Sequence, residues 1–260
     1  MTERIARIAD KVAGDLFARA PYAALAGEFK PADLAEAYRV QAAVQARLAA
    51  RRGAVAGRKI ALSSKPMQAM VGIAHPLAGA FFAGDVRQSP ATVAAGDFRH
   101  LGLEFELAFE LARDVPPGSG PHDAGSVRGL IAAVRPAFEL VDDMDADYAA
   151  IDAFTLVAGN AWVAGVVLGE PIPGWHELDI GNLAATVHEE GRDPERTSTG
   201  AADPLVSLAW VLNHFGGQGQ TVARGEHVIT GSAVRTRFPR PGDRLRYEVD
   251  GLAAVEAAVV

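Results

Sequence analysis

The spacing of apolar residues divides the chain into a short helical beginning and a longer β-rich remainder. Near the N-terminus apolar residues recur at every third or fourth position, at Ile5, Ile8, Val12 and Leu16. This spacing predicts a helix with one buried face. Pro21 interrupts it, and Pro31 starts a second predicted helix that stops before Gly53. We therefore expect residues 1–54 to form a helical arm.

From Val55 onward the apolar stretches are short, and Gly, Pro and Asp separate them too closely for long helices. Strands are predicted at 59–62, 80–82, 103–111, 134–141, 161–168, 227–230 and 245–249. Helical spacing returns only at Pro204–Phe215, and the Pro/Gly-rich segment 114–126 is typical of an exposed loop. Since no linker is evident, we expect one domain over residues 1–260, with 55–260 as its β-rich catalytic body.

The charge and composition exclude several classes of function. The chain of 260 residues has 25 Lys and Arg against 32 Asp and Glu, a net charge of −7, with no basic cluster suited to nucleic acid. It contains no cysteine, which excludes a thiol nucleophile, a disulfide framework and a thiolate metal site. Any metal must therefore be held by oxygen or imidazole.

The N-terminal segment lacks the apolar core of a signal peptide. The apolar runs at 161–169 and 252–260 fall well short of the roughly 20 residues that span a bilayer, and they are typical of buried strands. We expect a cytoplasmic protein without a membrane partner.

Glutamates alternate with apolar residues in the segment 103–111, LEFELAFEL. Because side chains on a strand alternate between faces, Glu104 and Glu106 should point the same way. The pattern is typical of a half-buried strand whose glutamates face water, and it also fits two carboxylates directed at one cation. This segment alone does not decide between them.

Glu139 is the only acidic residue in the apolar stretch 134–141. A carboxylate buried without a partner is costly, so it needs either a cation or an exposed face. Three carboxylates would suit Mg²⁺ or Mn²⁺, which prefer oxygen ligands. The aspartates that follow do not match the calcium-loop pattern and favour a surface loop: Asp142, Asp143, Asp145 and Asp147.

Lys59 is one of only four lysines and lies within the segment 57–68, GRKIALSSKPMQ. A lysine held in a dry pocket loses its proton more easily and can act as a general acid or base. The alternative is a lysine at a strand edge whose ammonium reaches water. The scarcity of lysine in this arginine-rich chain slightly favours the functional interpretation.

Six segments occur in an order and spacing that resembles a known family: GRKIALSSKPMQ, LEFELAFELARDV, VRPAFELVDD, GNAWVAGVVLG, DPLVSLAWVLNHF and GEHVITGS followed by PGD. They resemble the 2-keto-4-pentenoate hydratase family of the fumarylacetoacetate hydrolase superfamily, which includes the 4-oxalocrotonate decarboxylases. The resemblance covers about residues 5 to 257. It implies an α+β fold, a mixed β-roll with flanking helices, that assembles as a homo-oligomer.

The resemblance also implies roles for individual residues. The family's metal ligands fall on Glu104, Glu106 and Glu139, which would bind Mg²⁺ or Mn²⁺, and its catalytic lysine falls on Lys59.

On the substrate side, the family's hydroxyl positions fall on Ser63 and Ser64, and its asparagine falls on Asn160. Trp162 stands where relatives have small polar residues, so we expect a smaller or more apolar pocket. Leu77, or a near neighbour, occupies the place of an acid that many hydratases have. His75 could replace that acid, although a histidine beside proline is more typical of a loop.

These features predict a metal-dependent lyase acting on a small 2-oxo acid. The first expectation is a 2-keto-4-pentenoate (2-hydroxypenta-2,4-dienoate) hydratase of aromatic meta-cleavage catabolism. The alternatives are a 4-oxalocrotonate (2-oxo-3-hexenedioate) decarboxylase, an acylpyruvate-type C–C hydrolase and a non-catalytic metal-binding homologue. Metal chelation of the 1-carboxylate and the 2-oxo oxygen would support either lyase reaction.

Overall fold

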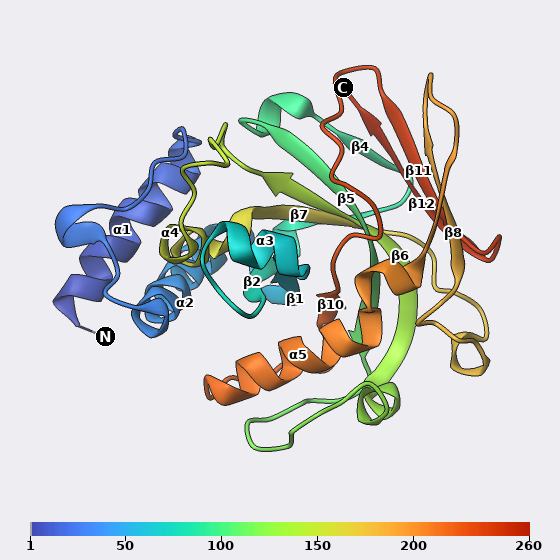
Figure 1. Cartoon of the computed structure of the whole chain (residues 1–260), viewed down its shortest axis with the longest axis horizontal. Coiled ribbons are helices and arrows are strands. Elements are labelled where there is room, and N and C mark those ends of the chain that lie inside the picture. Colours follow the sequence, from blue (N-terminus) through green and yellow to red (C-terminus); the bar gives the residue numbers. More distant parts are fainter. Residues whose placement is uncertain (1) are drawn as a thin grey trace.

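The computed structural model describes residues 2–260, and its N-terminal helices lie to one side of two β-sheets (Figure 1). Helix α1 spans Glu3–Ala18, and helix α2 spans Leu34–Arg52 after the N-cap Asp33, whose side chain accepts a hydrogen bond from the backbone of Glu36. The two predicted helices are therefore present. Their apolar faces pack together through residues that include Ile8, Val12, Val44 and Leu48.

A seven-stranded sheet crosses the middle of the molecule in the order β2-β1-β10-β5-β6-β7-β3. Its strands are β1 (Val55–Ala61), β2 (Leu77–Phe82), β3 (Val86–Gln88), β5 (Leu101–Leu111), β6 (Ile131–Asp142), β7 (Val163–Leu168) and β10 (His227–Ile229). The long strands β5 and β6 are antiparallel neighbours, whereas β1 and β10 are parallel. The sheet is therefore mixed.

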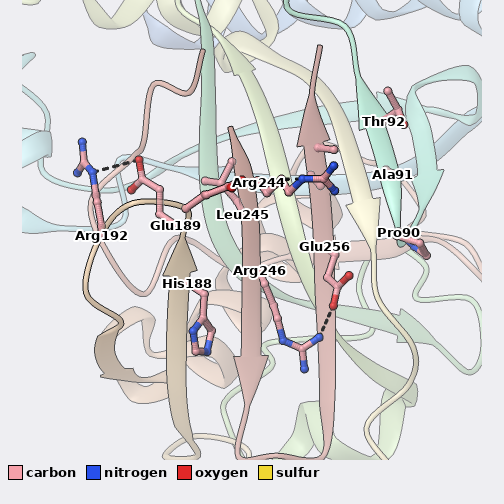
Figure 2. A pocket seen from close by; sticks show the side chains of 13 residues that line it. Pro90, Ala91, Thr92, His188, Glu189, Arg192, Arg244, Leu245, Arg246 and Glu256 are labelled. Atoms are coloured by element: carbon pink, nitrogen blue, oxygen red, sulfur yellow. Dashed lines mark hydrogen bonds and ion pairs between the residues drawn. The ribbon is translucent and has the colours of Figure 1, made fainter. Parts of the chain in front are cut away.

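A five-stranded sheet has the order β4-β12-β11-β8-β9. Its strands are β4 (Ala91–Val93), β8 (Ala184–Glu189), β9 (Glu195–Ser198), β11 (Arg244–Val249) and β12 (Ala253–Val259). Its side chains alternate, as the buried and partly exposed positions of β11 show. The polar face carries a shallow hollow of about 630 Å³, in which Arg246 pairs with Glu256 and Arg192 pairs with Glu189 (Figure 2).

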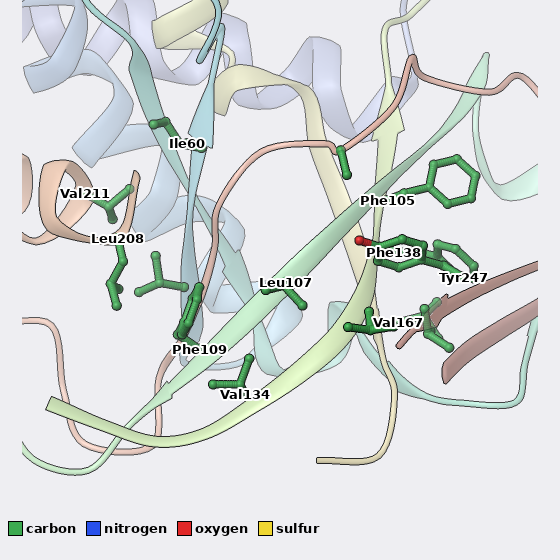
Figure 3. Close-up of a cluster of buried hydrophobic side chains, with 14 of the residues drawn as sticks. Ile60, Phe105, Leu107, Phe109, Val134, Phe138, Val167, Leu208, Val211 and Tyr247 are labelled. Carbon is green, nitrogen blue, oxygen red and sulfur yellow. The ribbon is translucent and has the colours of Figure 1, made fainter. Parts of the chain in front are cut away.

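The two sheets meet at a buried aromatic cluster (Figure 3). The ring of Phe105 packs edge-on against Phe138 at 5.3 Å and against Tyr247 of β11 at 5.9 Å. Such pairs contribute about 1 kcal/mol each beyond the burial of their surface. Phe105 and Phe138 alternate with the glutamates of β5 and β6, so packing of this face fixes the glutamates on the opposite face.

The other helices are α3 (Lys65–Met70), α4 (Ala153–Ala158) and α5 (Pro204–Gly217). Short 3₁₀ turns occur at Gly27–Phe29, Ala83–Asp85, Ala95–Asp97, Ser126–Leu130, Asn160–Trp162, Trp175–Glu177 and Thr199–Ala202. Within residues 2–260, no helix combines the length and the apolar character needed to cross a membrane.

The architecture is α+β, and each of the seven predicted strands is present with shifted ends. The strands β3, β4, β8 and β9 were not predicted. The strands β3, β4 and β9 have only three or four residues, and β8 (AATVHE) and β9 (ERTS) are largely small or polar, so their neighbours in the sheet define them.

Candidate active site

Two neighbouring strands bring three carboxylates together on one face of the seven-stranded sheet. Glu104 and Glu106 are two residues apart on β5, and Glu139 on β6 is the direct partner of Glu104 in the antiparallel register. One oxygen from each carboxylate lies within 4.8 Å of the others. The three residues predicted as metal ligands therefore form one cluster.

The chemistry of these carboxylates fits a cation. Glu106 is 1% exposed and Glu139 is fully buried, and Glu106 Oε1 and Glu139 Oε2 have no hydrogen-bond partner. Burial, followed by repulsion from the other two glutamates, raises the pKa of Glu106 well above its ordinary value. Burial also raises the pKa of Glu139 to about 7. Three convergent carboxylates that lack enough protein partners suit a hard divalent ion.

Two residues of the segment after β10 hold the carboxylates in place. The backbone N–H of Gly231 donates to Glu106 Oε2 at 2.7 Å, and the hydroxyl of Thr236 donates to Glu104 Oε1 at 2.6 Å. Because β10 ends at Ile229, the following chain is free to run beside β5 and supply these donors. The segment GEHVITGS was part of the family resemblance, but neither hydrogen bond could be predicted from it.

Lys59 of β1 points at the same cluster. Its Nζ lies 2.8 Å from Glu139 Oε1 as an ion pair, and it donates a hydrogen bond to the carbonyl of Ala161 at 3.1 Å. The side chain is buried, which disfavours its charge, but the charges of Glu139 and then Glu104 outweigh burial and raise the pKa of Lys59. Lys59 is therefore an internal lysine and does not lie at a strand edge exposed to water.

The carbonyl that receives Lys59 belongs to a left-handed turn. Asn160, Ala161 and Trp162 have φ angles of 60°, 53° and 61°, which for non-glycine residues costs roughly 1–2 kcal/mol each. The Asn160 side chain stabilises the turn. Its Nδ2 donates to the carbonyl of Ala80 at 2.7 Å, and its Oδ1 accepts from the backbone N–H of Ala80 at 3.0 Å. Gln45 of α2 also donates to Asn160 Oδ1 at 3.0 Å.

This turn differs from the expectation in two respects. The predicted strand at 161–168 begins only at Val163, because the preceding residues are left-handed. The side chain of Asn160, predicted on the substrate side, is 2% exposed and bonded to protein groups on both of its polar atoms. In this structure the side chain of Asn160 therefore supports the turn that carries the acceptor of Lys59.

The strand β2 lies against the turn through Gly79. A Cβ atom at this position would lie 2.7 Å from the carbonyl oxygen of Asn160 and 3.3 Å from Cγ of Lys59. Only glycine allows such a close approach of the two backbones.

The remaining predicted residues lie around this centre. Ser63 and Ser64 are exposed between β1 and α3, and a side chain at Gly231 would meet Ser63 Oγ at 3.0 Å. Trp162 is 9% exposed, and its indole packs edge-on against Tyr22 at 5.7 Å and Tyr148 at 5.8 Å.

The acid expected in many hydratases is absent from its predicted position. Leu77 is fully buried in an apolar cluster that includes Tyr38 and Trp162. His75 is exposed, and its Nδ1 contacts the carbonyl of Pro76 at 2.9 Å. Among residues 2–260, His75 forms no hydrogen bond or ion pair with the three glutamates; it lies near His214 of α5, whose pKa is lowered to about 4 by burial and then by His75.

The chain resembles characterised proteins over most of its length, although no protein-family model matches it. It is 30% identical over 207 residues to the 2-hydroxyhexa-2,4-dienoate hydratase of Comamonas testosteroni, covering 76% of this chain and 75% of that protein. It is 27% identical over 238 residues to a 2-keto-4-pentenoate hydratase of Paraburkholderia xenovorans, covering 90% and 87%.

A solved structure shares the whole fold. The 4-oxalocrotonate decarboxylase of Pseudomonas putida G7, complexed with magnesium and adipate, superposes with a TM-score of 0.90 at 23% identity. The match covers 100% of this chain and 99% of that one. At this identity the likeness establishes the fold.

Proposed function

Since the chain belongs to the family of the 2-keto-4-pentenoate hydratases and 4-oxalocrotonate decarboxylases, we propose that it is a divalent-metal-dependent lyase acting on a small 2-oxo acid. The observation that carries the proposal is the buried trio of Glu104, Glu106 and Glu139 beside Lys59. The favoured reaction is hydration of 2-hydroxypenta-2,4-dienoate in aromatic meta-cleavage catabolism.

The three glutamates would hold Mg²⁺ or Mn²⁺. When bound, such an ion supplies Lewis-acid stabilisation of the negative charge that develops on the oxygens of a 2-oxo acid. The carboxylates contribute the opposite charge, and the N–H of Gly231 and the hydroxyl of Thr236 keep two of them oriented.

Lys59 would move the proton. Its ammonium is stabilised mainly by the charge of Glu139, so any loss of that charge lets burial favour the neutral amine. The Ala161 carbonyl keeps Nζ oriented at the site in either form. In this proposal Lys59 Nζ transfers a proton to or from the conjugated carbon chain of the substrate, and Asn160 acts by positioning the turn.

The surrounding wall favours hydration of a short or apolar substrate over reaction of a dicarboxylate. Trp162 directly follows Ala161, whose carbonyl accepts from Lys59, and it packs in an apolar cluster with Leu77. Decarboxylation of 2-oxohex-3-enedioate is the second candidate, supported by the fold shared with the decarboxylase. Acylpyruvate hydrolysis ranks lower, because among the described residues no histidine forms a hydrogen bond or ion pair with the three glutamates.

Family membership supports four further proposals. We propose that Ser63 and Ser64 contact the substrate, that Trp162 limits its size, that the sheets form the mixed β-roll of the superfamily and that the protein works as a cytoplasmic homo-oligomer. We also propose His75, which is exposed just before β2, as a substrate contact.

The test is incubation of the Mg²⁺-loaded protein with each substrate while dienol absorbance and CO₂ are followed. We expect 2-hydroxypenta-2,4-dienoate to be consumed without release of CO₂. Release of CO₂ from 2-oxohex-3-enedioate, with no hydration of the dienoate, would replace the first candidate by the second. No turnover of either compound would refute both.

A further inference from the structure

Helix α2 carries a buried polar stripe on a face that lies against β2. Tyr38, Gln41 and Gln45 follow one another at intervals of three and four residues, so they share one side of the helix. All three are buried. Because burial of a polar side chain is costly unless it forms hydrogen bonds, the partners of this stripe indicate its role.

The stripe binds the outer edge of β2. This strand ends the seven-stranded sheet, and within residues 2–260 no other strand pairs with its outer edge. The hydroxyl of Tyr38 accepts a hydrogen bond from the N–H of Ala78 at 3.3 Å, and Gln41 Nε2 donates to the carbonyl of Ala78 at 2.8 Å. Side chains of α2 therefore take the place of a neighbouring strand at this residue.

Asn160 binds the same edge two residues further on, and α2 binds Asn160. The Asn160 side chain bonds both backbone groups of Ala80, and Gln45 Nε2 donates to Asn160 Oδ1 at 3.0 Å. Gln41 Nε2 also donates to the carbonyl of Val157, near the end of α4, at 2.8 Å. The left-handed turn that begins at Asn160 is therefore held between α2 and β2.

The turn needs this support because its conformation is unfavourable. Its three non-glycine residues have positive φ, and such residues keep this conformation only where their surroundings impose it. The carbonyl of the middle residue, Ala161, accepts the hydrogen bond from Lys59 Nζ at 3.1 Å. A change in the turn would therefore reorient Nζ. The glutamates are held separately, by β5, β6 and the segment after β10.

We propose that Gln45 is a positioning residue for Lys59, and that α2 thereby forms part of the active site. Gln45 holds Asn160, and Asn160 holds the turn whose carbonyl accepts from Lys59 Nζ. The inference rests on the proposed function, because it takes Lys59 as the group that transfers the proton. It assigns an effect on the rate of reaction to a helix outside the glutamate cluster.

Gln45→Met tests the proposal. Methionine has a similar size and helix propensity but cannot donate a hydrogen bond. Asn160 Oδ1 keeps the N–H of Ala80 as a partner, so the variant should fold. With Mg²⁺ and whichever candidate substrate the wild type consumes, we expect kcat to fall about tenfold while KM and Mn²⁺ affinity stay within about twofold. Gln45→Ala, which also lacks the donor, should show the same loss.

A double-mutant cycle with Lys59→Ala separates positioning from general damage. If Gln45 acts through Lys59, its replacement has nothing to act on once the ammonium is absent. Gln45→Met should then lower the residual kcat of Lys59→Ala by less than about twofold. A disturbance of the whole site would instead lower kcat by the same factor in both backgrounds.

The control for loss of stability is Ile8→Ala. Ile8 lies on α1 and packs with α2 in a buried apolar cluster, so its truncation weakens the packing of the two helices and removes no side-chain hydrogen bond. We expect a lower Tm and a kcat within about twofold of the wild type.

Each outcome decides the proposal. It is supported if kcat falls in Gln45→Met, if the fall disappears in the Lys59→Ala background, and if Ile8→Ala stays active. It is overturned if kcat is unchanged in Gln45→Met, falls equally in both backgrounds, or falls as far in Ile8→Ala. A loss confined to KM or Mn²⁺ affinity also overturns it. Failure of the proposed function is recognised separately, because the wild type then turns over neither candidate substrate.

Discussion

Replacement of Glu139 by glutamine tests whether ionisation of this buried carboxyl destabilises the metal-free protein. The carboxyl of Glu139 has a pKa of about 7 in the folded protein against an ordinary 4.5, with burial as the main cause. At 1.36 kcal/mol for each pH unit, this difference corresponds to about 3 kcal/mol of folding free energy.

The sign follows from proton binding. Between pH 4.5 and 7 the unfolded chain loses the Glu139 proton while the folded chain retains it, so rising pH destabilises the metal-free wild type. Glu139→Gln has no proton to lose at this position. Relative to the wild type, the variant should therefore become more stable by about 3 kcal/mol between pH 4.5 and 7.5.

The assay is urea denaturation in EDTA at several pH values. At each pH the free energy of unfolding of the wild type is subtracted from that of Glu139→Gln. Histidine titration occurs in both proteins and largely cancels in this difference. The control is Glu110→Gln on β5, because the Glu110 side chain is 31% exposed. Its free energy of unfolding relative to the wild type should change by less than about 1 kcal/mol over the same pH range. If the difference in free energy of unfolding between the wild type and Glu139→Gln does not vary with pH, the pKa of Glu139 is not raised in the folded protein.

Three further results are expected. Lys59→Ala should lower kcat at least about a hundredfold while the variant still folds and binds Mn²⁺, because Lys59 is assigned to proton transfer; unchanged kcat would point to a non-catalytic metal-binding protein. Asn160→Ala should destabilise the protein by roughly 3 kcal/mol in urea, since three buried hydrogen bonds are lost, and a change below 1 kcal/mol would contradict its role in the turn. Saturating Mg²⁺ should stabilise the wild type by about 3 kcal/mol at a hundred times its Kd and Glu139→Gln by much less, and equal stabilisation would remove Glu139 from the ligand set.

The sequence indicated the acidic residues because their chemistry conflicts with their surroundings. Alternation placed Glu104 and Glu106 on one face, and Glu139 was conspicuous among apolar neighbours. Their convergence depends on the pairing of Glu104 with Glu139 across β5 and β6. Such a register joins residues far apart in the chain, so local pattern could suggest a shared cation but could not establish the contact.

The left-handed turn at Asn160–Trp162 could not be predicted. Non-glycine residues seldom adopt positive φ, and the turn is maintained by contacts with Ala80 and Gln45, which are distant in sequence. The burial of Asp143 was missed for a similar reason. A run of aspartates is typical of a solvated loop, and only His100 and Tyr148 show that one member is held inside.

The central claim is that a divalent ion held by Glu104, Glu106 and Glu139 is required for reaction of a 2-oxo acid. Its most direct test is the rate of disappearance of 2-hydroxypenta-2,4-dienoate as EDTA-treated protein is titrated with Mg²⁺. We expect no reaction without metal and a rate that saturates at one ion for each chain. A rate that is independent of Mg²⁺, or absent at saturating Mg²⁺, would contradict it.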